Sequence, residues 1–78
     1  MKQLLAQHIG KTIRNTRLKK GITQTELAER LNTQQPSIAR LESGKILPNL
    51  SFLTDVCEEL EIDVMIDFSG YVKNANMR

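Results

Sequence analysis

The sequence predicts an all-α domain of four to five short helices that closes in a single C-terminal β-strand. Turn and capping residues divide residues 1–61 into short segments in which apolar residues recur every three or four positions. From Ile62 onward the apolar residues recur at every second position, which is typical of a strand. We therefore divide the chain into a helical domain over residues 1–61 and a strand with a tail over residues 62–78.

Length and composition limit the class of protein. The 78 residues suffice for one hydrophobic core, and the single cysteine, Cys57, excludes an intrachain disulfide and fits a reducing cytoplasm. No apolar run approaches the ~18 residues of a membrane-spanning helix, so no membrane partner is expected. One histidine and one cysteine provide too few groups for a metal centre or a catalytic triad. We therefore expect a cytoplasmic protein that is no enzyme and holds no metal or cofactor.

Charge is divided unevenly along the chain. Residues 1–45 hold nine cations and three acids, a net charge of +6, whereas residues 46–78 hold two cations and six acids, a net charge of −4. The overall charge of +2 conceals this division. A basic first half is typical of a surface that faces an anion such as nucleic acid, although two solvated faces would have the same composition.

The first helix is expected over residues 2–20 and ends at Gly21. Lys19 and Lys20 suit the negative C-terminal end of its dipole. Gly10 inside the helix costs about 1 kcal/mol relative to alanine. Apolar residues recur along one face with the i, i+4 spacing of an amphipathic helix, namely Leu5, Ile9 and Ile13, with Leu4 beside the first.

The second helix is expected over residues 24–31. Thr23 stands as its N-cap and Glu26 follows three residues later, which is the spacing of a capping box. The side chains expected to face inward are those of Leu27, Ala28 and Leu31.

The third helix is expected over residues 35–43, with Gly44 as its C-terminal stop. Pro36 fits only the first turn and biases the residue before it away from helical angles, so Gln35 is either the first helical residue or the N-cap. Ile38 and Leu41 are expected to face inward.

The fourth helix begins at Pro48 and Asn49 and continues to about Leu60. Its core positions are expected at Leu50, Leu53, Val56, Cys57 and Leu60. The strand that follows alternates apolar residues with acids, and its apolar positions are Ile62, Val64, Ile66 and Phe68.

The segment from residue 23 to residue 44 has the form of a helix-turn-helix. Small Ala28 lets two short helices cross closely, as this motif requires. The outward face of the second helix carries amides, a hydroxyl and a guanidinium, with no acid among them: Gln34, Gln35, Ser37 and Arg40. Glutamine can form two hydrogen bonds to one adenine, and arginine can form two to one guanine. We therefore expect helix 35–43 to contact bases in the major groove of double-stranded DNA.

The same segment, TQTELAERLNTQQPSIARLESGKILPNL, resembles the helix-turn-helix of the lambda-repressor-like (Xre) family of bacterial and phage regulators. The resemblance covers roughly residues 9–61. It rests on matched spacings at Thr23-Gln24, Glu26-Leu27-Ala28, Leu31, Ser37-Ile38, Leu41-Glu42, Gly44-Lys45 and Pro48.

The resemblance implies a role for individual positions. Contacts with base edges are implied for Gln34, Gln35, Ala39 and Arg40. Contacts with the DNA backbone are implied for Gln24, Ser37, Ser43 and Lys45. Arg17 and Glu42 are implied to form a structural ion pair between the first helix and the third. Pro36 departs from the polar residue usual in the family, and Arg14 on the first helix either contacts a phosphate or is solvated.

The C-terminal strand favours a homodimer. A lone strand cannot satisfy its own backbone, whereas pairing with the same strand of a second copy would do so and would create a two-fold axis. DNA half-sites about 34 Å apart require such an axis, so the expected function is that of a dimeric repressor on a palindromic operator. The alternative is a hairpin that folds back through Ser69-Gly70.

A helix that runs into a strand also resembles the antitoxins of type II toxin–antitoxin modules. This resemblance implies autoregulation of an operon and a toxin that binds away from the DNA. The residues that could bind the toxin are Phe52 and the acids Asp55, Glu58, Glu59 and Glu61. A stand-alone repressor is an equal hypothesis. The competing class is a protein-interaction module that neutralises a toxin and has little DNA binding of its own.

Overall fold

Local capping signals define the four helices of residues 1–64, the part of the chain that the structure, a computed structural model, describes. The helices are α1 (Lys2–Lys19), α2 (Gln24–Arg30), α3 (Gln35–Ser43) and α4 (Leu50–Glu59). Their bounds lie within two residues of those expected from the sequence, the largest difference being the start of α4 at Leu50 instead of Pro48. The all-helical prediction for residues 1–61 is therefore confirmed.

Side-chain caps begin two of the helices. At α2 the Thr23 hydroxyl accepts from the Glu26 N–H at 3.0 Å, and the Glu26 carboxylate accepts from the Thr23 N–H at 2.8 Å, so the capping box is complete. At α4 the Asn49 side chain accepts from the Phe52 N–H at 2.7 Å. The N-cap of α3 is Gln34, which makes Gln35 the first helical residue and places Pro36 in the first turn.

Three helices end in the same way, with one residue in the left-handed conformation. These residues are Gly21 at φ 70°, Asn32 at φ 55° and Glu61 at φ 59°. In each case the next N–H bonds the carbonyl five residues back: Ile22 to Arg17, Thr33 to Ala28 and Ile62 to Cys57. This closure satisfies helix carbonyls that would otherwise lack partners.

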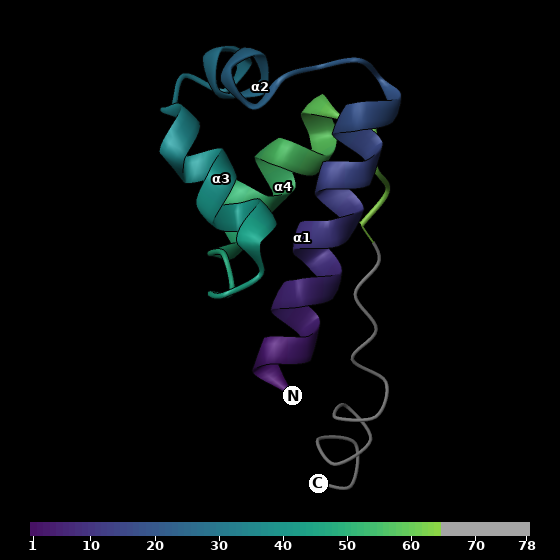
Figure 1. Ribbon diagram of the computed structural model, residues 1–78, viewed down its shortest axis with the longest axis vertical. Coiled ribbons are helices and arrows are strands. Elements are labelled where there is room, and N and C mark those ends of the chain that lie inside the picture. Colours follow the sequence, from purple (N-terminus) through teal and green to yellow (C-terminus); the bar gives the residue numbers. More distant parts are fainter. Residues whose placement is uncertain (65–78) are drawn as a thin grey trace, which may run out of the picture.

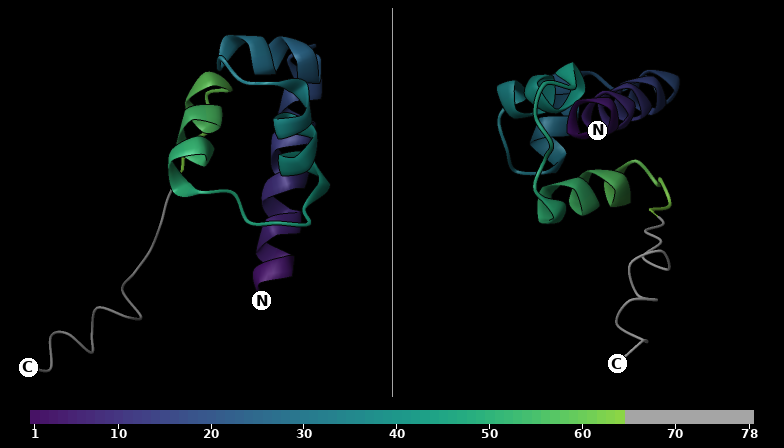
Figure 2. Two further views of the ribbon diagram at one scale, coloured as in Figure 1. Left: turned by 90° about the vertical axis from the view of Figure 1, so that its left-hand side faces the viewer. Right: turned by 90° about the horizontal axis from the view of Figure 1, so that it is seen from below.

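The helices form two layers. Figure 1 shows α1 and α3 beside each other, with α2 crossing their upper end. Figure 2 shows that α4 forms a separate layer opposite α1 and α3, and that α2 spans both layers. The first turns of α1 extend beyond the other three helices in both figures.

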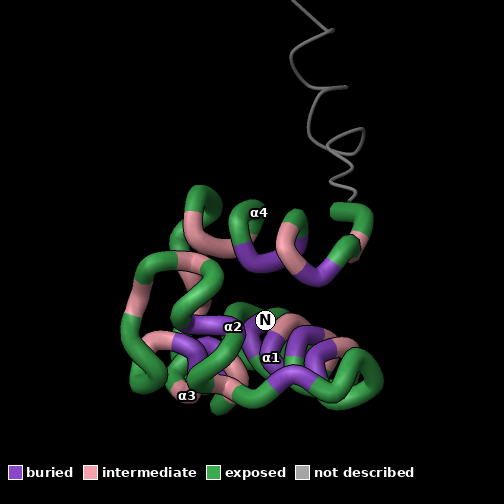
Figure 3. The backbone as a smooth tube through the Cα atoms, turned by 90° about the horizontal axis from the view of Figure 1, so that it is seen from above, coloured by how far each residue is buried: buried purple, intermediate pink, exposed green. Residues whose placement is uncertain are grey.

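The core lies between these layers. Its fully buried side chains come from all four helices and the residue after α4: Ile13, Leu27, Ile38, Val56 and Leu60. Figure 3 shows that the buried side of α4 is turned toward the buried sides of the other helices.

Three apolar residues expected in the core are exposed, and these predictions were wrong. Leu4 is 67% exposed, Leu5 52% and Leu50 58%. The buried residues of α1 are Ala6, Gly10, Ile13 and Arg17, so Ile13 is buried as expected, whereas Ala6 and Gly10 are buried in place of Leu4 and Leu5. Small side chains at the first two of these positions allow a neighbouring helix to come close, which large leucines would prevent.

Gly10 marks the closest approach between α1 and α3. A Cβ atom built on Gly10 would lie 2.8 Å from the carbonyl oxygens of both Leu41 and Glu42. At the end of α3, a Cβ on Gly44 would lie 2.8 Å from the Cα of Gln7, and its φ is 71°. The two backbones therefore meet at glycines on both sides of the contact.

The expected dimer strand lies only partly within the described residues. Residues 62–64 belong to no helix or strand of the described chain. Ile62 is half-buried against the core, and Val64 is 43% exposed. The remaining strand positions, Ile66 and Phe68, lie outside the described residues.

Candidate nucleic-acid interface

The outward face of α3 carries the side chains expected to contact bases. Gln34, Gln35 and Arg40 are exposed, whereas Ala39 is half-buried. Ile38 and Leu41 on the opposite face of the helix are buried in the core. The structure therefore brings the four expected base-contacting residues onto one short helix whose other side is anchored.

Beneath this face lies the ion pair between Arg17 of α1 and Glu42 of α3. The Arg17 Nε donates to one carboxylate oxygen at 2.6 Å, and a terminal nitrogen donates to the other at 2.9 Å. The second terminal nitrogen donates to the Ile22 carbonyl at 2.7 Å. Only 7% of the Arg17 side chain and 3% of the Glu42 side chain are exposed. The side-chain hydrogen bonds to Glu42 raise the pKa of Arg17, and two parallel bonds between a guanidinium and a carboxylate fix the geometry of the pair.

Two glutamines extend this pair to the surface. The Gln24 amide nitrogen donates to a Glu42 carboxylate oxygen at 3.0 Å. The Gln35 amide nitrogen in turn donates to the Gln24 amide oxygen at 2.7 Å. A continuous series of hydrogen bonds therefore connects buried Arg17 to exposed Gln35 through three helices. Sequence reasoning missed this series because it depends on how the N-termini of α2 and α3 meet.

The residues expected to contact the DNA backbone surround the face of α3. Lys45 and Arg14 are exposed, and Gln24 and Ser37 are half-buried. Ser43 is exposed, but its hydroxyl donates to the Arg40 carbonyl at 2.6 Å and accepts from the Lys45 N–H at 3.3 Å. A phosphate can only accept hydrogen bonds, so Ser43 would have to break its bond to Arg40 to bind one.

Cations near α3 differ from those near α4 in their partners. Within residues 1–64, Arg14, Arg40 and Lys45 form no salt bridge. By contrast, Lys20 pairs with Glu61 at 2.9 Å and Arg30 with Glu59 at 3.6 Å. Lys2, Lys11 and Lys19 of α1 also form no salt bridge in this range, so the contrast is confined to α3, where Arg40 and the following Lys45 have no acidic partner.

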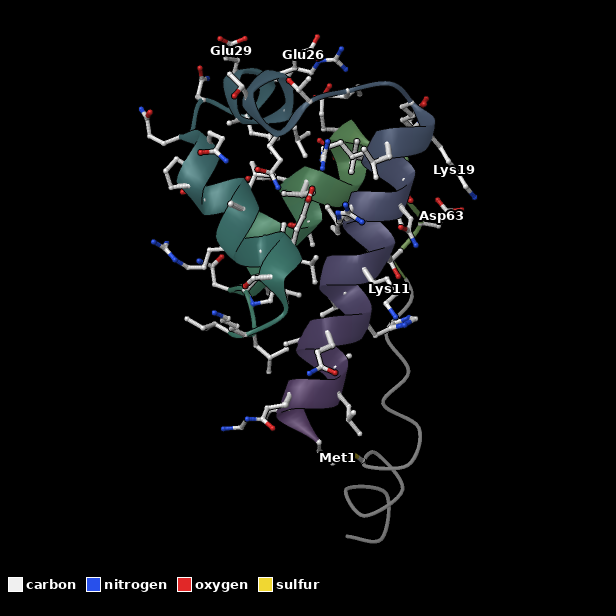
Figure 4. The ribbon with its side chains drawn as sticks, viewed as in Figure 1. Met1, Lys11, Lys19, Glu26, Glu29 and Asp63 are labelled. Carbon is white, nitrogen blue, oxygen red and sulfur yellow. The ribbon has the colours of Figure 1, made fainter. Side chains whose placement is uncertain are left out.

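The acids of α2 point elsewhere. Figure 4 shows Glu26 and Glu29 projecting from α2 away from the other helices, and Lys19 on the side of α1 away from α3. Glu26 is held by the capping box, and its bonds to Thr23 lower its pKa. The face of α3 therefore carries amides and cations, with the acids of α2 turned away from it.

Three further observations concern metal ligands, membrane-spanning helices and the cysteine of the described residues. Over this range, no three His, Cys, Asp or Glu side chains lie together in a way that could hold a metal ion. No helix there is long and apolar enough to cross a membrane. Burial raises the pKa of the Cys57 thiol, which keeps it protonated within the core.

Comparisons with known proteins identify the family of this segment. The sequence model of a family described as Helix-turn-helix matches residues 13–65. Endothelial differentiation-related factor 1 homolog from Danio rerio is 40% identical over 47 residues, which are 60% of this chain and 32% of that protein. Endothelial differentiation-related factor 1 from Homo sapiens is 44% identical over 41 residues, which are 53% of this chain and 28% of that protein. The chain thus spans less than a third of the length of these curated relatives, and no solved structure matches it significantly.

Proposed function

The chain belongs to the helix-turn-helix family, a family of DNA-binding domains, and we propose that it regulates transcription by placing α3 in the major groove of double-stranded DNA. The observation that carries this proposal is the outward face of α3. It presents two exposed glutamines and an exposed arginine, with no acid beside them. These side chains can make the bidentate contacts that distinguish adenine and guanine from other bases.

We assign the residues to two kinds of contact. In this proposal Gln34, Gln35 and Arg40 contact base edges, and Ala39 contacts a thymine methyl group. Lys45, Arg14 and Gln24 position the domain on the phosphates, together with Ser37 and Ser43. The buried ion pair holds α1 and α3 together beneath this surface.

The binding test measures affinity at several salt concentrations. Duplex DNA is first selected from a random pool with the whole chain, and the dissociation constant is then measured by fluorescence anisotropy. Phosphate contacts release counterions, so log affinity should fall linearly with log salt. An affinity that does not depend on salt would contradict the proposal.

Point variants separate the two kinds of contact. Arg40→Ala should cost about 1–3 kcal/mol on the selected sequence and relax the choice of base at one position. Lys45→Ala should weaken binding to selected and random DNA alike. Lys19→Ala is the matched control, because this exposed lysine lies on the side of α1 away from α3 (Figure 4) and should have no effect. Equal losses on both DNAs from Arg40→Ala would refute its role at a base.

We extend the proposal to a dimeric repressor that binds a palindromic operator. The support is the alternation of apolar residues over 62–68 and the 43% exposure of Val64 next to half-buried Ile62. Val64→Asp should shift the native mass measured by ultracentrifugation from that of two chains to that of one. A wild-type chain that is monomeric at micromolar concentration, free and on DNA, would refute the dimer.

A protein partner is the second candidate function, favoured by the surface of α4. Asp55 and Glu58 are exposed there, and apolar Leu50 is 58% exposed at the same helix. This surface suits a basic partner with an apolar contact, as an antitoxin of a toxin–antitoxin module would require. Co-purification with the product of an adjacent gene, abolished by Leu50→Asp, would support it. A native mass that never exceeds two copies of this chain when the two genes are co-expressed would count against it.

A further inference from the structure

The hydrogen bonds between Glu42, Gln24 and Gln35 have a fixed direction. A carboxylate only accepts hydrogen bonds, so the group that Gln24 turns toward Glu42 must be its NH2. The Gln24 amide oxygen must then face Gln35, and Gln35 must answer with its own NH2. Reversing either amide would place two acceptors or two donors against each other. The hydrogen-bond partners therefore determine which end of each amide is the nitrogen and which is the oxygen.

Glu42 itself has no freedom to turn. Arg17 bonds both of its carboxylate oxygens and is held in turn by the Ile22 carbonyl. Both side chains of this pair are more than nine-tenths buried. The starting point of the series is thus a fixed, charged acceptor.

After Gln35 has bonded Gln24, its side chain still has one hydrogen-bond acceptor and one donor for a base. Its amide oxygen and the second hydrogen of its NH2 remain for an outside partner, and the residue is exposed. Adenine offers an NH2 donor at N6 and an acceptor at N7 in the major groove. An amide held in one orientation can place its oxygen at N6 and its NH2 at N7 in only one way.

We propose that Glu42 is a positioning residue that sets the order of donor and acceptor that Gln35 presents to DNA. Its carboxylate acts through Gln24 and touches no nucleotide. The preference for adenine at one base pair is then determined by a buried ion pair under the helix. This inference rests on the proposed DNA-binding function.

Gln34 is the internal contrast. It is exposed, and its side chain does not cap the helix. Its amide can present either order of donor and acceptor, so the base pair it contacts should show a weaker preference than the one contacted by Gln35.

The test compares two variants that interrupt the series at different places. Gln24→Met removes the link and leaves the ion pair in place. The double variant Arg17→Met/Glu42→Met removes the carboxylate and keeps Gln24. Replacement of a whole buried ion pair by apolar residues of similar volume is often tolerated, so the double variant is expected to fold. Circular dichroism checks the fold of both.

The readout is base preference measured on the selected duplex, with each base pair changed in turn. Gln35→Ala identifies the base pair that Gln35 contacts. Both test variants should lower the preference for adenine at that base pair about tenfold, which is about 1.4 kcal/mol. The preference at the base pair contacted by Arg40 should stay unchanged, because none of the hydrogen bonds in this series includes the Arg40 side chain.

Two results from the variants would overturn the inference. If only Gln24→Met lowers the preference, Gln24 supports Gln35 without any influence of Glu42. If the preference falls at all base pairs alike, the role of Glu42 is structural. A wild-type chain that shows no base preference would overturn the proposed function and this inference with it.

A measurement without DNA distinguishes a failure of this inference from a failure of the proposed DNA-binding function. The side-chain NH2 signals of Gln24 and Gln35 in a ¹H–¹⁵N spectrum should move in the double variant, and those of Gln34 should not. Unchanged Gln35 signals would refute the influence of Glu42 even if DNA binding stands. Moved signals in a chain that does not bind DNA would leave the amide series intact and refute only the proposed function.

Discussion

The layer of α1 and α3 and the layer of α4 are held together by different interactions. Between α1 and α3 the backbones meet at Gly10 and Gly44, and a buried ion pair joins the helices. α4 is joined to the other helices mainly by buried apolar side chains, and the polar links near its end are exposed. Apolar contacts are non-directional, whereas hydrogen bonds to charged groups fix distance and angle. The more exact geometry thus lies where α3 and its amides must be oriented.

The largest expected effect is the loss of one partner of the buried ion pair. Glu42→Ala leaves the Arg17 guanidinium buried without its carboxylate, which should lower the free energy of unfolding by about 3–5 kcal/mol. Urea unfolding followed by circular dichroism measures the loss.

Glu59→Ala is the matched control in the other layer. Its pair with Arg30 spans 3.6 Å, with 34% of the Glu59 side chain and 48% of the Arg30 side chain exposed. Solvent screening limits such a pair to about 0.2–1 kcal/mol. Similar losses for the two variants would remove the distinction between the layers.

The second effect tests the close approach of α1 and α3. Gly10→Ala would gain about 1 kcal/mol from helix propensity. Its Cβ would meet two backbone carbonyl oxygens of α3 at 2.8 Å, and backbone cannot move aside as a flexible side chain can. Overpacking of this kind costs about 1–3 kcal/mol, so we expect a net loss of stability and weaker DNA binding.

Gly21→Ala is the control for this variant. Its φ is 70°, but no atom lies within 4 Å of the added Cβ. It should lose about 1 kcal/mol from backbone strain alone and leave DNA affinity unchanged for the folded protein. A Gly10→Ala protein that is more stable than wild type would show that α3 can move away without cost.

The bounds of the helices could be predicted from the sequence because the signals that set them are local. Thr23 and Glu26 cap α2, Asn49 caps α4, and Gly44 ends α3, each within a few residues of the helix that it limits. The candidate face of α3 followed in the same way, from the side chains that alternate with Ile38 and Leu41. These predictions needed no knowledge of how the helices pack.

The packing of the first turns of α1 could not be predicted, because apolar periodicity does not say which row of residues meets a neighbour there. Leu4 and Leu5 are the larger side chains, yet the row of Ala6 and Gly10 is buried. The bond from Gln35 to Gln24 likewise joins residues on two helices. Both features depend on the distance between helices, which a local pattern does not contain.

The smallest effect is expected at the cap of α2, which lies beside α3 but is open to solvent. The bonds from the Thr23 backbone and hydroxyl lower the pKa of Glu26. A carboxylate whose pKa is lower in the folded state stabilises the fold above its ordinary value of about 4.3, and this contribution is lost as the pH falls through the folded pKa. Glu26→Gln keeps an acceptor in the capping box but does not titrate.

The difference in urea midpoint between wild type and Glu26→Gln should therefore favour wild type at pH 7 and disappear as the pH falls below about 4.3 and through the lowered pKa of Glu26 in the folded state. Glu29→Gln, on the same helix but outside the capping box, controls for the removal of one charge from α2. A wild-type advantage that persists unchanged at pH 3 would mean that the Glu26 charge adds nothing to the cap. The stability of α2 would then come from its packing against α3 and the core, just as α4 is held mainly by apolar packing. Directional hydrogen bonds that stabilise the fold around α3 would then be confined to the buried pair of Arg17 and Glu42.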